Sequence, residues 1–186
     1  MLKTFSILLI FTFLGACSSN HKTGVVYHEG FDFSQVKSYS FYSRNSAFTD
    51  SQSLIDTRRN AIEIAIERTM ENNNFNFLEP EHADVIVTYY LFDGKVREYS
   101  TYNDVIRFCT RCLRASTWQT ENQYSTLKKG SLIIDLVDPT SKRSVWRSAY
   151  PLGIKAKDNS AKLNEKTQQA VNLMLAQFPK DKSLVN

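Results

Sequence analysis

The chain has 186 residues, of which 42% are hydrophobic and 23% are charged, and its formal net charge is +4 at pH 7. This composition is that of an ordinary globular domain, so it argues against a chain that is disordered over its length. The modest positive charge permits contact with anionic lipid or a cell-wall polymer without predicting either.

The first sixteen residues have the layout of a secretory signal peptide. Lys3 is their only charged residue, and it precedes a ten-residue, almost wholly apolar run from Phe5 to Leu14. A helix that spans a bilayer needs about 20 residues, so this run is too short for a transmembrane anchor. A basic start, a short apolar stretch and small residues after it indicate a segment removed after export. We therefore predict a signal peptide over residues 1–16.

The sequence Leu14-Gly15-Ala16-Cys17 resembles a lipobox, the signal read by the enzymes that make bacterial lipoproteins. The resemblance implies that the Cys17 sulfur takes a diacylglyceryl group, that cleavage follows before Cys17, and that the new amine is acylated. Two or three acyl chains give stable anchoring to membrane lipid, whereas one chain binds only marginally. The alternative is an ordinary cleaved signal peptide with a chance cysteine after the cleavage site.

The residues after Cys17 indicate a tether and a destination. Residues 17–24 are predicted to be the acylated cysteine and a flexible, small and polar linker. Ser18 stands where an inner-membrane retention signal would resemble Asp. We therefore expect a protein of the bacterial cell envelope, anchored in the outer membrane and facing the periplasm.

Hydrophobic patterns along the rest of the chain predict a single domain over residues 25–180, followed by a polar tail over 181–186. The predicted strands cover residues 36–42, 84–92, 132–137 and 145–150, and the predicted helices cover about 50–72 and 160–178. Asp50 or Ser51 could cap the first helix, and Asn residues end it. Two amphipathic helices and a hairpin indicate an α+β fold, a two-layer sandwich with a mostly antiparallel sheet and both helices on one face.

Four pieces of this pattern resemble a bacterial lipoprotein family known as domain of unknown function 4136. They are Asp32-Phe33-Ser34 with the strand that follows, Ala83 to Val87, Gly130 to Asp138 with Val145-Trp146-Arg147, and the terminal Phe178-Pro179. The resemblance covers about residues 30 to 179. It implies a fold and an envelope location, but no established activity and no catalytic residues.

Cys109-Thr110-Arg111-Cys112 is the one motif with chemistry of its own. If Cys17 carries lipid, one cysteine pair remains in an oxidising compartment. We expect Cys109 and Cys112 to form a local structural disulfide. A redox-active pair, a metal site and free thiols stay open as alternatives. A zinc site would need two more ligands, and the histidines are scattered, so no metal and no cofactor is predicted.

The stretch from Asp93 to Lys129 is polar and rich in Tyr and Arg, and it is long for a connection. Tyr, Trp and Arg are enriched at binding hot spots. The candidate binding surface comprises Tyr99, Tyr102, Arg107, Arg111, Arg114 and Trp118. The alternative is a longer hairpin whose aromatic residues pack against the sheet. Nucleic acid is not expected as a partner, because the compartment holds little of it.

Asp135, Trp146 and Arg147 are expected to be structural. We expect Trp146 to pack under a helix and Arg147 to form an ion pair at the surface or the sheet edge. Asp135 lies mid-strand between apolar neighbours, and Arg147 on the paired strand is a possible partner.

The common catalytic motifs are absent from the sequence, so no catalytic residue is predicted. We expect a non-enzymatic lipoprotein that contacts another envelope component, either a protein or a glycan. The alternatives are a thiol–disulfide redox protein using Cys109 and Cys112, and a carrier of a lipid or small hydrophobe between sheet and helices.

Overall fold

The computed structural model describes residues 24–43, 52, 54–109, 111–112, 114–115, 127–155 and 157–179. The predicted signal peptide, Cys17, the tether up to residue 23 and the tail over 181–186 lie outside these residues. Among the described helices, none combines the length and the apolar character that crossing a bilayer requires.

Within the described residues, the strands form one seven-stranded sheet in the order β3-β2-β4-β6-β7-β1-β5. The strands are β1 (Gly24–Tyr27), β2 (Ser38–Phe41), β3 (Asn76–Phe77), β4 (Val85–Phe92), β5 (Arg114–Ala115), β6 (Ser131–Asp138) and β7 (Arg143–Pro151). Strand β2 runs parallel to β3 and β4, and every other pair is antiparallel. The predicted α+β class with a mostly antiparallel sheet is therefore confirmed.

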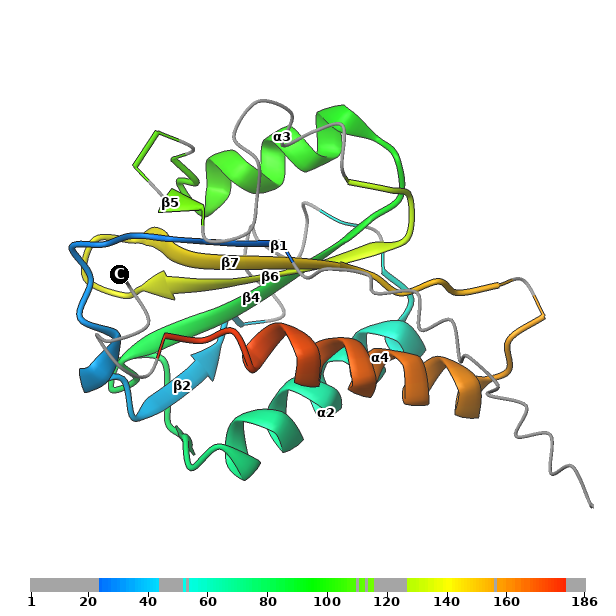
Figure 1. The fold of residues 1–186 in the computed structure, drawn as a ribbon, viewed down its shortest axis with the longest axis horizontal. Helices are drawn as coiled ribbons and strands as arrows, with labels where there is room; N and C mark the ends of the chain where they lie inside the picture. Colours follow the sequence, from blue (N-terminus) through cyan, green and yellow to red (C-terminus); the bar gives the residue numbers. More distant parts are fainter. Residues whose placement is uncertain are drawn as a thin grey trace, which may run out of the picture.

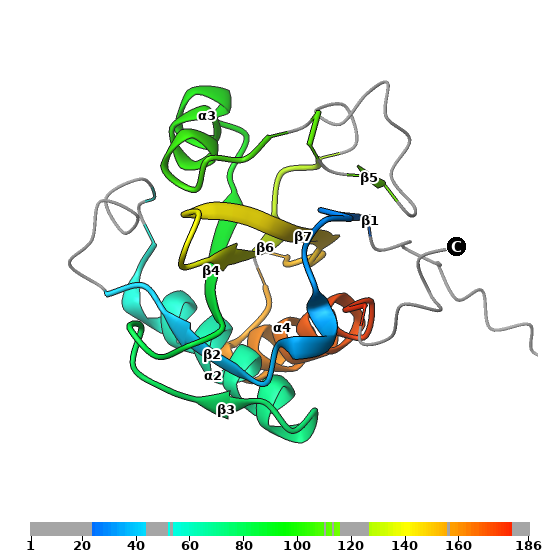
Figure 2. The ribbon, with the colours of Figure 1, turned by 90° about the vertical axis from the view of Figure 1, so that its left-hand side faces the viewer.

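Three α-helices, α2 (Asp56–Asn72), α3 (Val96–Val105) and α4 (Ser160–Leu175), lie among the described residues, with a short 3-10 turn, η1 (Phe33–Gln35). Figures 1 and 2 show α2 and α4 against one face of the sheet and α3 against the other. The predicted two-layer sandwich does not include α3, which adds a third layer on the other face of the sheet. The strands β4, β6 and β7 bury residues on both faces, so both faces need a cover.

The ends of the helices differ in how they are capped. Helix α2 begins at Asp56, and its N-cap, Ile55, makes no side-chain hydrogen bond, so the cap predicted at residue 50 or 51 is wrong. After α2, Asn74 has the left-handed φ of 63° that the run of Asn residues predicts. The N-cap of α4 is Asn159, whose side chain accepts a hydrogen bond from the Lys162 amide at 2.9 Å.

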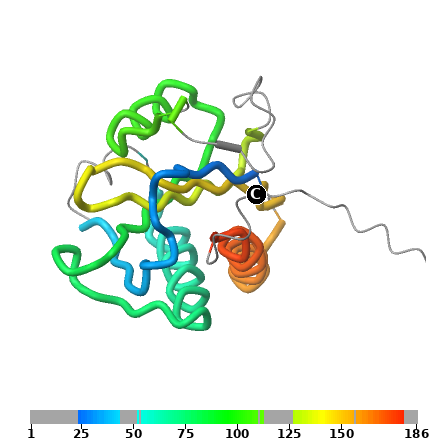
Figure 3. The backbone as a smooth tube through the Cα atoms, turned by 60° about the vertical axis from the view of Figure 1, so that its left-hand side comes forward, coloured from blue at the N-terminus to red at the C-terminus, as the bar shows by residue number. Residues whose placement is uncertain are grey.

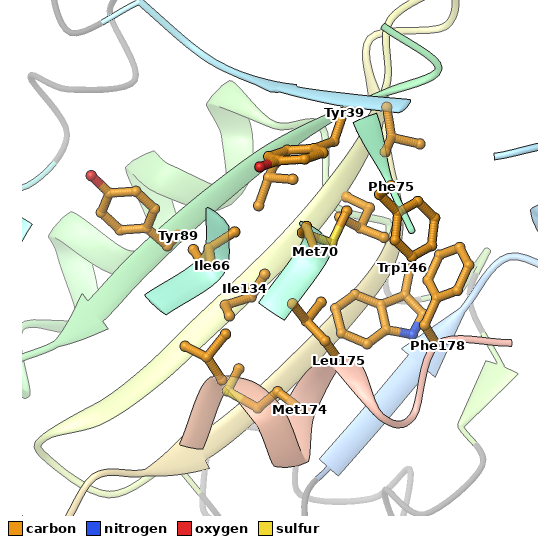
Figure 4. Packing of buried hydrophobic residues seen from close by; sticks show 14 of the residues in the cluster. Tyr39, Ile66, Met70, Phe75, Tyr89, Ile134, Trp146, Met174, Leu175 and Phe178 are labelled. Atoms are coloured by element: carbon orange, nitrogen blue, oxygen red, sulfur yellow. The ribbon is translucent and has the colours of Figure 1, made fainter. Parts of the chain in front are cut away.

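The larger core lies between the sheet and the α2–α4 layer. Figure 4 shows side chains from both helices interlocked with those of β2, β4, β6 and β7. The ring of Phe178, just after α4, meets that of Phe75 edge-on at 5.4 Å, and Trp146 lies 6.5 Å away. Trp146 is thus packed beneath the end of a helix, as expected. Burying each large apolar side chain of this kind contributes about 1.5–3 kcal/mol.

Two tyrosines of this core, labelled in Figure 4, offer a matched test of polar burial. The Tyr89 hydroxyl donates to Glu63 at 2.6 Å, whereas the Tyr39 hydroxyl is buried without a hydrogen-bond partner among the described residues. We expect Tyr39→Phe to raise the free energy of unfolding by up to about 1 kcal/mol, because it removes an unsatisfied polar group. Tyr89→Phe should lower it by about 1–2 kcal/mol. Urea unfolding at pH 7 measures both, and equal losses would contradict this account.

Tyr39 also makes the free energy of unfolding depend on pH. Burial, and then the carboxylates of Glu67 and Glu71, raise the pKa of Tyr39 to about 12. In the unfolded chain a tyrosine ionises near pH ~10, so the stability that this shift contributes is complete below that pH. It is lost as the pH rises toward 12. We expect the unfolding free energy of the wild type to fall across this window more steeply than that of Tyr39→Phe.

Candidate functional site

A buried ion pair lies on the sheet face that α3 covers. The hairpin of β6 and β7 places Asp135 directly opposite Arg147 in register. The Arg147 Nε donates to the two carboxylate oxygens of Asp135 at 2.8 and 3.1 Å. The expected pairing is therefore present. The expected position of Arg147 at the surface or edge is wrong, because both side chains have no exposed area.

Helix α3 supplies most of the remaining partners of this pair. Arg147 donates from Nη1 to the Tyr99 hydroxyl at 2.9 Å and from Nη2 to the Asn103 side-chain oxygen at 2.8 Å. Tyr102 donates from its hydroxyl to Asp135 at 2.6 Å. Residues at i, i+3 and i+4 share one face of a helix, so a single face of α3 holds both charged partners.

Two hydroxyls and one ring complete the shell around the pair. Ser144 donates to Asp135 at 2.6 Å, and Thr88 shares a 2.9 Å hydrogen bond with Tyr102. The ring of Phe108, just beyond α3, lies over the Arg147 guanidinium at 3.4 Å. An aromatic face attracts a cation more strongly where water is excluded.

The surroundings of Arg147 and Tyr102 keep both side chains protonated. Burial by itself would lower the pKa of Arg147, but the Asp135 carboxylate and the tyrosine oxygens raise it above the ordinary value. Burial, together with the Asp135 charge, raises the pKa of Tyr102 well above its usual value. At neutral pH Arg147 therefore stays a cation and Tyr102 stays a neutral donor.

The segment after α3 is tied to the sheet and closed by a bridge. The Ile106 carbonyl, at the end of α3, accepts a hydrogen bond from the Ser144 amide at 3.0 Å. Cys109 and Cys112 form the expected disulfide, and the Cys112 amide donates to the Cys109 carbonyl at 3.0 Å. The bridge therefore closes a single turn beside the ring that covers Arg147.

Comparison with known proteins agrees with this architecture. The model of the family described as domain of unknown function (DUF4136) matches residues 24–180. The chain belongs to the DUF4136 family. The predicted resemblance is confirmed.

Two solved structures are similar to this chain, to different degrees. A DUF4136 family protein from Bacteroides thetaiotaomicron VPI-5482 is 16% identical, with a TM-score of 0.53 over 87% of this chain and 97% of that one. A PDZ domain protein from Parabacteroides distasonis ATCC 8503 is 14% identical, with a TM-score of 0.44 over 87% of this chain and 37% of that one. The first likeness supports the fold alone, and the second is too low to support any argument. A comparison with curated proteins found no match.

In the structure of this DUF4136 domain, some residues of the predicted binding surface are buried and others are exposed. Tyr99 and Tyr102 are 4% and 0% exposed, so their place on a binding surface is wrong, because their hydroxyls are used inside the network. Arg107 is exposed beside the disulfide turn, and Arg111 is exposed within it. Arg114 lies in β5, opposite Tyr27, and Trp118 lies outside the described residues.

Four members of the site were not among the predicted site residues: Thr88, Asn103, Phe108 and Ser144. Asn103 follows Tyr99 at helical spacing, and this polar periodicity is the signal that could have revealed it. Within the described part of the chain, no group of three or more His, Cys, Asp or Glu residues is placed to hold a metal ion.

The buried pair predicts a large asymmetry between interior and surface charges. Asp135→Asn leaves the Arg147 cation in the interior without a counter-charge, and we expect it to lower the unfolding free energy by about 3–5 kcal/mol. The matched control is Glu165→Gln, which removes one charge from the exposed 2.7 Å pair with Lys162 and should change stability by less than about 1 kcal/mol. Urea unfolding compares the two, and similar losses would show that the buried pair is unimportant.

Proposed function

We propose that this DUF4136 protein is a lipid-anchored lipoprotein of the bacterial envelope that acts by binding another envelope component. The anchor is Cys17, and the binding side is the C-terminal end of α3. The proposal rests on a contrast between the polar groups beneath α3 and those at its C-terminal end. Those beneath the helix are hydrogen-bonded to one another, while Arg107 and Arg111 at its end project outward.

The lipobox supports the anchoring half of the proposal. Acyl chains contribute about 0.8 kcal/mol for each buried CH₂, so two or three of them hold a small domain at a bilayer without a transmembrane helix. The segment from Cys17 to Thr23 is then a linker between the lipid and β1, which begins at Gly24. Ser18 after the cysteine favours the outer membrane.

The buried network supports binding over catalysis. A general acid or base needs access to a substrate and a pKa near the working pH. Asp135 and Arg147 have no exposed area, and their hydrogen-bond partners are supplied by the protein itself. Such a network fixes a helix in place, and a fixed helix presents its end residues as a preformed surface.

The anchor is tested by Cys17→Ser in the native host. We expect the wild type in the membrane fraction, with an intact mass that shows cleavage before Cys17 and added acyl chains. Cys17→Ser should shift to the soluble fraction without that added mass. The double substitution Cys109→Ser/Cys112→Ser is the control and should stay in the membrane. A wild-type protein whose intact mass lacks acyl chains would contradict the proposed lipid anchor.

The cysteine pair offers the competing function, because Cys112 is exposed and the bridge lies beside Arg111. A thiol–disulfide enzyme would reduce insulin in the presence of dithiothreitol, and its first thiol would have a lowered pKa. We expect the wild type to show no more turnover than Cys109→Ser/Cys112→Ser, with thioredoxin as the positive control. If the wild type reduced insulin and the double variant did not, the proposed binding function would be rejected in favour of redox catalysis.

A further inference from the structure

Two segments far apart in the sequence bring four cations to one end of the domain. The hydrogen bond between the Ile106 carbonyl and the Ser144 amide joins the end of α3 to the start of β7. Figures 1 and 3 show this end of α3 above the turn that links β6 and β7. The basic cluster is defined as the exposed side chains of Arg107, Arg111, Lys142 and Arg143.

The backbone beneath the basic cluster is held by local bonds. Arg107 and Lys142 have left-handed φ values of 49° and 58°, which residues other than glycine rarely adopt. Their amides donate to the carbonyls of Asp104 at 3.1 Å and Asp138 at 2.9 Å. Arg111 lies inside the turn that the disulfide closes. The cations are therefore mounted on fixed backbone, and a ligand that binds them has less chain to immobilise.

The charges of the basic cluster are not neutralised by ion pairs. Elsewhere on the surface, Lys95, Lys162 and Lys166 each pair with a carboxylate. In the part of the chain that the structure describes, the four cations of the cluster have no ion-pair partner. Two carboxylates lie close in the chain, those of Asp104 and Asp138. The Asp138 oxygens already accept hydrogen bonds from the turn, and a positive excess remains.

We propose that the basic cluster binds the carboxylates of the cell-wall glycopeptide, peptidoglycan. This inference rests on the proposed function, which places the domain in the periplasm. Peptidoglycan is the polymer of that compartment, and its peptide stems carry repeated carboxylates. Arginine forms paired hydrogen bonds with a carboxylate, and three of the four cations are arginines. A polymer with many carboxylates can engage several of them together.

The direction of β1 favours the wall over the anchoring bilayer as the partner. β1 begins at Gly24, opposite Ala149 of β7, and ends at Tyr27, opposite Trp146. The basic cluster lies beyond the second end, near Arg143. The linker joins the domain at the first end. A domain tethered there can turn the basic cluster away from the membrane that holds it.

The experiment is co-sedimentation of the detergent-solubilised, lipidated full-length protein with purified sacculi. The test variant carries Gln in place of Arg107, Arg111, Lys142 and Arg143. The matched control carries Gln in place of four exposed cations outside the basic cluster, Arg58, Arg68, Lys129 and Lys157. Two further arms use sacculi whose carboxyl groups have been amidated, and vesicles of phosphatidylglycerol. Circular dichroism melting shows that both variants are folded.

The expected result is saturable wild-type binding that weakens with salt, because exposed charges are screened. The test variant should bind about ten-fold more weakly or worse, since four weak ion pairs are lost together. The control variant should bind sacculi as tightly as the wild type does. Neither of these two proteins should bind amidated sacculi. Equal weakening of both variants, unchanged binding to amidated sacculi, or binding to the vesicles alone would each overturn the inference.

Failure here is separable from failure of the proposed function. The intact mass and the membrane fraction of the test variant report the anchor independently of sacculus binding. A lipidated protein in the membrane fraction that ignores sacculi refutes the peptidoglycan assignment and leaves the anchor standing. A protein without acyl mass refutes the anchor itself.

Discussion

The arrangement of this domain depends on one buried ion pair, between Asp135 and Arg147 on the neighbouring strands β6 and β7. Moving two charges out of water costs several kcal/mol for each ion, and their mutual attraction offsets this only when further hydrogen bonds complete both groups. The strands themselves offer Asp135 one such bond, from Ser144, and offer the guanidinium tips of Arg147 none. Helix α3 provides the rest, so the helix and the ion pair require each other.

This mutual requirement explains which parts of the fold could be read from the sequence. The strands β4, β6 and β7 and the helices α2 and α4 are apolar at regular spacing, and periodicity identifies them. Helix α3 escapes that reading, because the side chains it buries are tyrosines and an asparagine. The two tyrosines pack against the charged pair and also against apolar neighbours on this face of the sheet, among them the rings of Tyr90 and Phe92. A hydrophobic pattern does not reveal a helix face whose buried side chains carry polar tips as well as apolar rings.

The same chemistry explains why the sequence pattern favours a binding surface for Tyr99 and Tyr102. Tyrosine and arginine combine apolar area with polar tips, which suits the centre of an interface and also the wall of a buried polar network. Composition alone does not separate these two roles. The strand register does, because Asp135 and Arg147 point to the same face, and a charged pair there demands a polar cover. Combining this register with the polar periodicity of residues 96–105, which precede the hairpin, would have placed α3.

The interior and the exterior of the α3 layer are thus linked through the backbone. Beneath the helix, positive and negative charge balance, and the hydrogen bonds of Tyr99, Tyr102 and Asn103 hold the helix against the sheet. At its end, the bond from Ser144 to the Ile106 carbonyl and the disulfide turn transmit that rigidity to residues whose positive charge has no internal counterpart. A charged cluster on a mobile loop would lose conformational entropy on meeting a ligand, whereas a cluster built on this braced layer has little left to lose.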